Sequence, residues 1–317
     1  MNSKTILVAL GGNAILRPKQ EATFENQLAN VSASCRILAR LIEMGYRLII
    51  THGNGPQVGN ILRQNEEARK VVPQMPLDVC NAESQGLIGY MVQQSLRNEL
   101  ELIGVSKSVV SLVTRVEVSP DDQAFQNPTK PIGAFYSEEE AKELMKDKGW
   151  ILKEDANRGW RRVVPSPQPI RILEADIIKR MVDQDQIVIA CGGGGIPVVR
   201  KTDGTHRGIE AVIDKDHSGC KLAQEVGADV MLILTDVENA YIHYGRPEQK
   251  ALTRVTIAEL EKFKQEGHFS EGSMKPKIDA AARFADSGGT SIICSLNHAD
   301  LALQGEKGTL IVKEAKV

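Results

Sequence analysis

Three charged residues stand side by side at Asp214, Lys215 and Asp216, directly after the apolar stretch 211–213. An acid–base–acid cluster against an apolar segment is unfavourable unless the charges meet a partner. A phosphate group with its metal ion is one such partner. The alternative is a solvated loop in which an aspartate caps the helix that follows. The cluster alone leaves both interpretations open, so the choice depends on the rest of the chain.

Glycine-rich turns follow three largely apolar runs of the chain. The runs are residues 6–10, 47–51 and 186–190, and the turns are residues 11–13, 53–55 and 192–195. Uninterrupted apolar runs are typical of buried parallel strands, and ligands gather at the carboxyl ends of such strands. Glycine lets backbone N–H groups approach a phosphate closely, although a flexible turn also explains residues 192–195.

Two lysines, Lys215 and Lys277, stand at the expected starts of helices, and Asp236 follows another apolar run. Backbone donors, lysines and carboxylates are what phosphoryl transfer needs, because that reaction is mostly positioning and charge neutralisation. The glycine run at 192–195 does not fit G-x-G-x-x-G, and G-K-[ST] is absent from the chain. A nicotinamide-type Rossmann site and a P-loop are therefore both poorly supported.

The elements that must position these residues alternate between strand and helix. This order predicts an α/β fold with a parallel sheet and right-handed crossovers. The periodicity predicts helices over 24–42, from about 56, over 78–103, 221–226 and 257–264, and from about 272 onward. It predicts strands over 6–10, 47–51, 108–118, 186–190, 230–235, 290–295 and 309–312, with a small hairpin over 240–244.

The composition changes between residues 119 and 169. Six of the thirteen prolines lie there, together with both tryptophans, Trp150 and Trp160. A long surface loop is one explanation. Two large aromatic side chains favour another, an insertion that folds as its own small unit around a packed core.

Composition and charge exclude several classes of protein. The 317 residues carry a formal net charge of −2, so nothing points to nucleic acid or an anionic membrane as a partner. Five cysteines without a C-x-x-C pair are typical of reduced thiols in a cytoplasmic protein, not of a disulfide or zinc framework. The apolar run at 6–10 is too short for a signal peptide or a membrane span.

Six motifs in order resemble those of carbamate kinases, which belong to the wider amino-acid kinase superfamily. They are L-G-G-N-A at 10–14, T-H-G-N-G-P-Q at 51–57, C-G-G-G-G-I-P-V at 191–198, A-V-I-D-K-D at 211–216, L-T-D-V at 234–237 and G-S-M-K-P-K at 272–277. In the insertion, N-P-T-K-P-I-G at 127–133 is similar to the protruding subdomain of that family. The resemblance covers residues 6–312.

The resemblance implies a three-layer αβα sandwich with an open, mainly parallel sheet. Residues 1–185 would form the carbamate lobe, with the protruding subdomain inserted at about 119–169, and residues 186–317 the nucleotide-binding lobe. It implies a homodimer in the cytoplasm that converts MgATP and carbamate to ADP and carbamoyl phosphate. In arginine catabolism, as in the arginine deiminase pathway, the reaction runs toward ATP. Mg²⁺ would be the cofactor, held through the nucleotide phosphates, and no protein ligand is assigned to it.

The resemblance also assigns roles to residues. Lys130, Lys215, Asp216 and Lys277 would be catalytic, with Asp216 orienting the lysines and Lys130 reaching in from the subdomain. The carbamate and the phosphoryl group would be lined by Gly11, Gly12, Asn13, Gly53, Asn54, Gly55, Gly193 and Gly194. The nucleotide would lie along Asp214, Thr235, Asp236, Val237, Tyr241 and Met274.

One position departs from other members of the superfamily. Acetylglutamate kinases carry a lysine two residues before the Gly-Gly pair, where this chain has Ala9. Carbamate kinases share this departure, and Lys130 or Lys215 is the expected replacement charge. Carbamate is already an oxyanion and needs no general base, so no histidine is assigned a catalytic role. His52 is either a substrate contact or a packing residue at a strand end.

Two other functions stay open at this point. Another kinase of the superfamily, such as acetylglutamate kinase, would need a binding group for the second carboxylate of its acceptor, and none is evident. A catalytically inactive sensor of nucleotide or carbamoyl phosphate would be favoured by loss of Lys215, Asp216 or Lys277, and all three are present.

Overall fold

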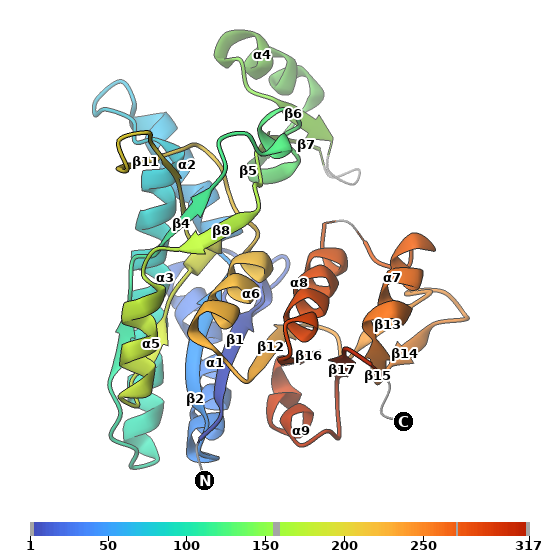
Figure 1. Cartoon of the computed structure of the whole chain (residues 1–317). Coiled ribbons are helices and arrows are strands. Elements are labelled where there is room, and N and C mark those ends of the chain that lie inside the picture. The colour runs from blue at the N-terminus through green and yellow to red at the C-terminus, as the bar shows by residue number, and fades with distance from the viewer. Residues whose placement is uncertain (1–2, 155–158, 271, 315–317) are drawn as a thin grey trace.

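The structure, a computed structural model, describes residues 3–154, 159–270 and 272–314. An eight-stranded sheet runs through the molecule in the order β15-β17-β16-β12-β1-β2-β9-β3 (Figure 1). Only the β16–β17 pairing in this sheet is antiparallel. The strands are β1 Thr5–Leu10, β2 Arg47–His52, β3 Val109–Ser111, β9 Ile187–Ile189, β12 Val230–Thr235, β15 Arg254–Thr256, β16 Thr290–Ser295 and β17 Thr309–Val312. The predicted open, mainly parallel sheet is confirmed.

Helices cover both faces of this sheet. Leu7 and Ala9 of β1 join a core with α5 Ala175–Asp183, α6 Lys215–Val226, α7 Ile257–Gln265 and α8 Met274–Asp286. Ile6, Val8 and Leu10 point the other way, to α1 Phe24–Glu43, α3 Leu77–Leu102 and α9 Ala299–Leu303. All six residues of β1 are buried because neither face of the sheet meets solvent, which explains the uninterrupted apolar run. The three-layer sandwich is thereby confirmed.

A second sheet of four strands, in the order β11-β10-β4-β8, lies beside the first. Its strands are β4 Arg115–Val118, β8 Pro169–Ile172, β10 Ile196–Arg200 and β11 His206–Gly208. The single strand predicted over 108–118 is wrong, since the chain leaves the central sheet after β3 and enters this one at β4. At the break, the backbone N–H of Thr114 donates to the Gln85 side chain at 2.8 Å instead of to a neighbouring strand. The hairpin expected within 240–244 is wider, because β13 Ala240–Ile242 pairs with β14 Lys250–Leu252.

The insertion carries a compact unit of its own above α2 Gly55–Ala68 (Figure 1). Its three-stranded sheet has the order β5-β7-β6 and packs with α4. The elements are β5 Lys130–Tyr136, α4 Glu138–Lys148, β6 Leu152–Glu154 and β7 Trp160–Val164. Its buried residues are aliphatic, whereas both tryptophans, the residues that favoured a packed core, are only half-buried. Trp150 instead lies against the cationic groups of Lys148 and Arg162, at 4.6 and 4.7 Å. The limits at about 119 and 169 stay a prediction.

This small subdomain is joined to α2 by close packing. Ile132 and Val164 share an apolar cluster with Val58 of α2. Gly59 of α2 lies so close to the subdomain that an added Cβ would be 3.1 Å from the Cα of Gly133. The base of the subdomain is therefore fixed to α2.

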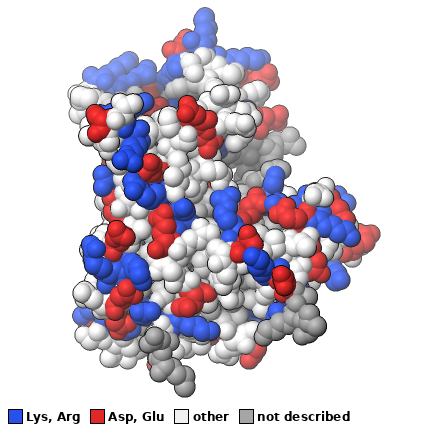
Figure 2. Space-filling model, viewed as in Figure 1, with Lys and Arg blue, Asp and Glu red and all other residues white. Residues whose placement is uncertain are grey.

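The surface carries both signs of charge. On the face shown in Figure 2, basic and acidic side chains are interspersed over the whole outline, with no broad area of one sign. Among the helices of the described residues, none combines the length and the apolar composition that crossing a bilayer requires.

Candidate active site

Turns that are far apart in the sequence meet where β1 and β2 end and α6 begins. A Cβ added to Gly53 would lie 3.7 Å from Cδ of Lys215 and 3.9 Å from the backbone nitrogen of Gly12. The two glycine turns and the acid–base–acid cluster therefore face one another. This is the carboxyl edge of the parallel strands, where ligands of such sheets bind.

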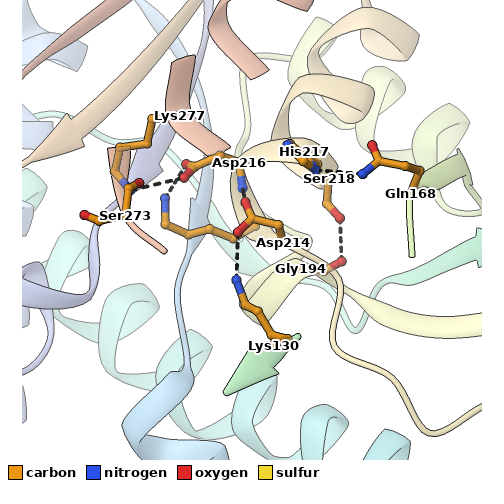
Figure 3. A network of polar contacts seen from close by, with 10 residues as sticks. Lys130, Gln168, Gly194, Asp214, Asp216, His217, Ser218, Ser273 and Lys277 are labelled. Atoms are coloured by element: carbon orange, nitrogen blue, oxygen red, sulfur yellow. Dashed lines mark hydrogen bonds and ion pairs between the residues drawn. The ribbon is translucent and has the colours of Figure 1, made fainter. Parts of the chain in front are cut away.

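A buried carboxylate connects two lysines at this edge (Figure 3). Asp216 accepts from Nζ of Lys215 at 2.5 Å through one oxygen and from Nζ of Lys277 at 3.3 Å through the other. The Asp216 side chain is only 3% exposed, and the two lysines come from the first turns of α6 and α8. The structure thus brings together three of the four residues expected to be catalytic.

The ionisation of this cluster is set by burial and by the paired charges. Burial raises the pKa of the Asp216 carboxyl, but the two lysines outweigh this effect and hold that pKa below its usual value. Burial lowers the pKa of Lys215 more than Asp216 raises it. For Lys277 the balance is reversed, since Asp216 and Asp214 raise its pKa against burial. Asp216 is therefore ionised near neutral pH.

The fourth expected catalytic residue, Lys130, reaches the same place from the small subdomain (Figure 3). Its Nζ donates to Oδ2 of Asp214 at 2.7 Å. Oδ1 of Asp214 caps α6 by accepting from the backbone N–H of Asp216 at 2.9 Å. Burial raises the pKa of Asp214, but Lys130, His217 and Lys215 hold it well below its usual range. Asp214 therefore caps the helix, as one of the two interpretations of the sequence held, and it also pairs with a charged group, Lys130.

These charges border a cavity of about 200 Å³. The lining residues include nine that the sequence had singled out: Gly53, Asn54, Gly55, Lys130, Gly193, Asp214, Lys215, Asp216 and Lys277. Gly11, Gly12, Asn13 and Gly194 are not among its lining residues. We name this space the phosphoryl cavity.

A second cavity of about 570 Å³ lies next to it along α8. Five of the six residues expected along the nucleotide line it: Thr235, Asp236, Val237, Tyr241 and Met274. The sixth, Asp214, lies in the phosphoryl cavity. Ser273 lines both spaces, so they adjoin at the start of α8. We name the larger space the nucleotide cavity.

Asn13, in the turn after β1, contacts a residue in the wall of the nucleotide cavity. Its Nδ2 donates to Oδ2 of Asp236 at 3.0 Å, and Thr235 donates its hydroxyl to the other oxygen of Asp236 at 3.0 Å. The turn after β1 therefore borders the nucleotide cavity through Asp236.

The glycine run at 192–195 is required first by packing within the chain. A Cβ on Gly193 would lie 2.1 Å from the amide nitrogen of Asn54, and one on Gly194 would lie 2.0 Å from the carbonyl oxygen of Ile213. Both glycines also have positive φ, 64° and 91°. The carbonyl of Gly194 accepts from the hydroxyl of Ser218 at 2.6 Å. The run thus fixes α6 and Asn54 at the site, and only Gly193 of the predicted pair lines the phosphoryl cavity.

Sequence reasoning missed a set of buried polar residues on α3. The amide of Asn54 donates to Asn81 at 2.5 Å and to Ser84 at 2.8 Å, and Asn81 in turn donates to the carbonyl of Gly195 at 2.7 Å. Gln85 donates to the carbonyl of Gly192 at 3.1 Å. The available signal was a group of polar residues three and four positions apart on an otherwise buried helix. Sequence reasoning also missed His243, Tyr244, His268 and Phe269 in the wall of the nucleotide cavity.

The structure assigns His52 to packing. It is 1% exposed, its Nδ1 lies 3.0 Å from the carbonyl of Gly53, and a Cβ on Gly192 would be 2.4 Å from its Nε2. His217 lies beside Gln168, with Nδ1 3.2 Å from the amide nitrogen. Neither histidine is among the lining residues of the two cavities.

Comparison with known proteins defines the class. The model of the amino acid kinase family matches residues 4–295, and the chain therefore belongs to this family. Carbamate kinase of Pyrococcus horikoshii is 51% identical over 96% of this chain and 98% of that protein. Carbamate kinase 1 of Enterococcus faecium is 51% identical over 98% of this chain and 99% of that protein. The structure of carbamate kinase from Giardia lamblia bound to AMP-PNP superposes with a TM-score of 0.93, at 45% identity and 99% coverage of both chains. The resemblance to carbamate kinases predicted from the motifs is confirmed.

Burial of His52 predicts a pH-dependent stability. Burial lowers the pKa of His52 to about 4, so the folded chain keeps a neutral imidazole down to that pH while the unfolded chain takes up a proton below about 6.5. The free energy of unfolding should therefore fall by about 3 kcal/mol between pH 6.5 and pH 4 through this group, with no further loss below. Denaturant unfolding of wild type and His52→Gln across this range measures the difference. Equal slopes in the two proteins would contradict the assignment.

Proposed function

We infer that this chain is a carbamate kinase, a phosphotransferase that uses a carboxyl group as acceptor. It transfers a phosphoryl group reversibly between ATP and carbamate, giving ADP and carbamoyl phosphate. The curated relatives, about half identical over nearly their whole length, support this activity. The observation on the site that carries it is the Lys215–Asp216–Lys277 cluster, which borders a cavity adjoining one of nucleotide size.

The two cavities suit the two halves of the reaction. The nucleotide would occupy the larger one, with its phosphates pointing past Ser273 toward the N-terminus of α8, where backbone N–H groups favour anions. Lys215 and Lys277 would neutralise the charge on the group in transfer, and Asp216 would hold them in place. Carbamate would attack from the side of Gly53 and Asn54. Because its oxygen is already an anion, no general base is required.

We propose that Mg²⁺ enters with the nucleotide. The described residues contain no group of three or more His, Cys, Asp or Glu side chains that could hold a metal ion. Phosphate and carboxylate oxygens are the ligands that this ion prefers, and Asp236 offers a carboxylate in the nucleotide cavity. When bound, the ion would neutralise phosphate charge and orient the phosphates.

We also propose that the chain works as a homodimer, with α3 and the edge strand β3 at the interface. Val79, Leu87 and Tyr90 form an exposed stripe on α3, at 36%, 38% and 54% exposure, and Val113 beyond β3 is 57% exposed. A hollow of about 380 Å³ lies between the helix and the strand. Apolar residues gathered beside an unpaired sheet edge are typical of an interface.

The cytoplasmic, ATP-forming role in arginine catabolism is part of this proposal. All five cysteines are buried and none is in a disulfide, which suits a reducing compartment. The pathway rests on the resemblance to carbamate kinases.

The activity is tested by coupled detection of ATP formed from ADP and carbamoyl phosphate in the presence of Mg²⁺. Turnover is expected with these substrates and should cease when EDTA removes the metal. N-acetylglutamate in place of carbamate should give no ADP from ATP. Nucleotide binding without turnover would identify an inactive sensor instead.

The two lysines that share Asp216 should each be required for turnover. Lys215→Ala and Lys277→Ala are expected to lower kcat about 10²–10³-fold, because each removes charge that stabilises the transferring group. Lys221→Ala is the matched control, since this α6 lysine pairs with Glu225 away from both cavities and its variant should keep kcat near wild type. A near wild-type kcat in Lys215→Ala or Lys277→Ala would show that the altered lysine is structural.

The proposed interface predicts a monomeric variant. Tyr90→Glu combined with Val113→Glu places two charges on the apolar face and should halve the molar mass measured by light scattering. Tyr244→Glu, which alters an exposed tyrosine in the nucleotide lobe, should leave the mass at that of the dimer. A dimeric double variant would locate the interface elsewhere, and a monomeric wild type would contradict the homodimer.

A further inference from the structure

Two aspartates form ion pairs with three lysines at the phosphoryl cavity, one aspartate with two lysines and the other with one. Asp216 binds Lys215 and Lys277, which are 12% and 14% exposed. Asp214 binds Lys130, whose side chain is 33% exposed. Lys130 is therefore the most accessible of the three lysines, and Asp214 is the carboxylate that restrains it.

Both oxygens of Asp214 are engaged, each with a different element. Oδ1 accepts from the N–H of Asp216 and so caps α6, while Oδ2 accepts from Lys130 (Figure 3). A carboxylate that caps a helix has a fixed orientation, and the helix dipole favours its negative charge. Lys130 is thus held against a rigid element of the nucleotide lobe, although it belongs to the small subdomain.

The backbone around Lys130 makes this contact specific. Lys130 is the first residue of β5, and prolines at 128 and 131 restrict the chain on either side. The subdomain touches the segment before α6 at a second point, where the N–H of Val212 donates to the carbonyl of Pro165 at 3.0 Å. The Lys130–Asp214 pair is therefore the charged member of a two-point junction between the subdomain and the start of α6.

We propose that Asp214 is a positioning residue that holds Lys130 at the phosphoryl cavity, where the lysine contacts the transferred group and not the nucleotide. This inference rests on the proposed carbamate kinase activity. An ammonium group has three hydrogens, and the bond to Asp214 uses one, so two remain for the oxygens of carbamoyl phosphate. The role differs from the nucleotide contact that the sequence resemblance assigned to Asp214, and it agrees with the absence of Asp214 from the residues lining the nucleotide cavity.

Asp214→Asn separates the two functions of this side chain, which are capping α6 and pairing with Lys130. Asparagine caps helices about as well as aspartate, so α6 keeps its cap while the charge on Lys130's partner is lost. We expect at least about a tenfold rise in KM for carbamoyl phosphate together with a lower kcat, because an electrostatic contact to the transferring group is misplaced. KM for ADP should stay near the wild-type value. Lys130→Met, which removes the ammonium and keeps the stem, should show the same pattern.

The double variant Asp214→Asn with Lys130→Met tests whether the two residues act as a unit. Its kcat/KM for carbamoyl phosphate should be no lower than that of the less active single variant. The losses of two residues that act together do not add in free energy. Thermal unfolding without substrate is measured for the wild type, the two single variants and the double variant. The losses in stability should also be non-additive, which tests the contact independently of activity. Asp122→Asn is the matched control, since Asp122 caps a 3₁₀ turn at residues 123–125 through Ala124 at 2.8 Å and lines neither cavity.

Three results would overturn the inference. If Asp214→Asn raises KM for ADP as much as KM for carbamoyl phosphate, Asp214 belongs to the nucleotide site. If it lowers KM for carbamoyl phosphate, the pair withholds Lys130 from the substrate. If the kinetic effects multiply in the double variant, the two residues act independently even where the unfolding data show contact. Failure of the wild type to form ATP would instead disprove the proposed function, and the unfolding cycle would still report on the pair.

Discussion

The rest of the site depends on one buried carboxylate, Asp216, held between Lys215 and Lys277. Burying ions is unfavourable, and removal of one partner leaves an uncompensated charge. Each of the three residues therefore depends on the others. Two ammonium groups and one carboxylate leave a surplus of positive charge at the phosphoryl cavity. In the proposed reaction the negative charge of the phosphoryl group would balance this surplus, so such a cluster suits a binding site better than a hydrophobic core.

The sheet topology brings the other parts to this cluster. β1 lies between β12 and β2, so its terminal glycine turn is next to the ends of both neighbours. A Cβ on Gly11 would lie 2.9 Å from the carbonyl of Leu234, which shows how tightly the turn follows β12. Gly219 lets α6 approach the sheet, since a Cβ there would be 3.3 Å from the side chains of Leu7 and Thr51. Small residues at these crossings set where the first turn of α6 can place Lys215.

The sequence predicted those parts whose signals are local. Buried parallel strands are apolar throughout, turns at strand ends are rich in glycine, and lysines mark the starts of α6 and α8. It could not predict the break at Thr114, because the backbone N–H there donates to the side chain of Gln85, which comes from α3. It also could not separate the two uses of the run at 192–195, where packing against Asn54 and Ile213 requires glycine as strictly as a phosphate would. Contacts between distant segments leave no periodicity to detect.

The source of positive charge depends on position 9, where the resemblance places a lysine in acetylglutamate kinases and this chain has Ala9. Ala9 is fully buried and points into the core shared with α5 to α8, so no charged group can enter the cavity from that strand position. Lys215 approaches Gly53 and Gly12 from α6, but Asp216 already engages it. The most accessible ammonium group at the cavity, that of Lys130, comes from a separate subdomain and reaches the cavity from the first residue of β5, which is paired with Asp214 at the start of α6. A small acceptor such as carbamate offers few contacts of its own. In the proposed reaction its binding therefore depends on the docking of a whole subdomain, whereas a lysine fixed on β1 would make it depend on a single rigid strand.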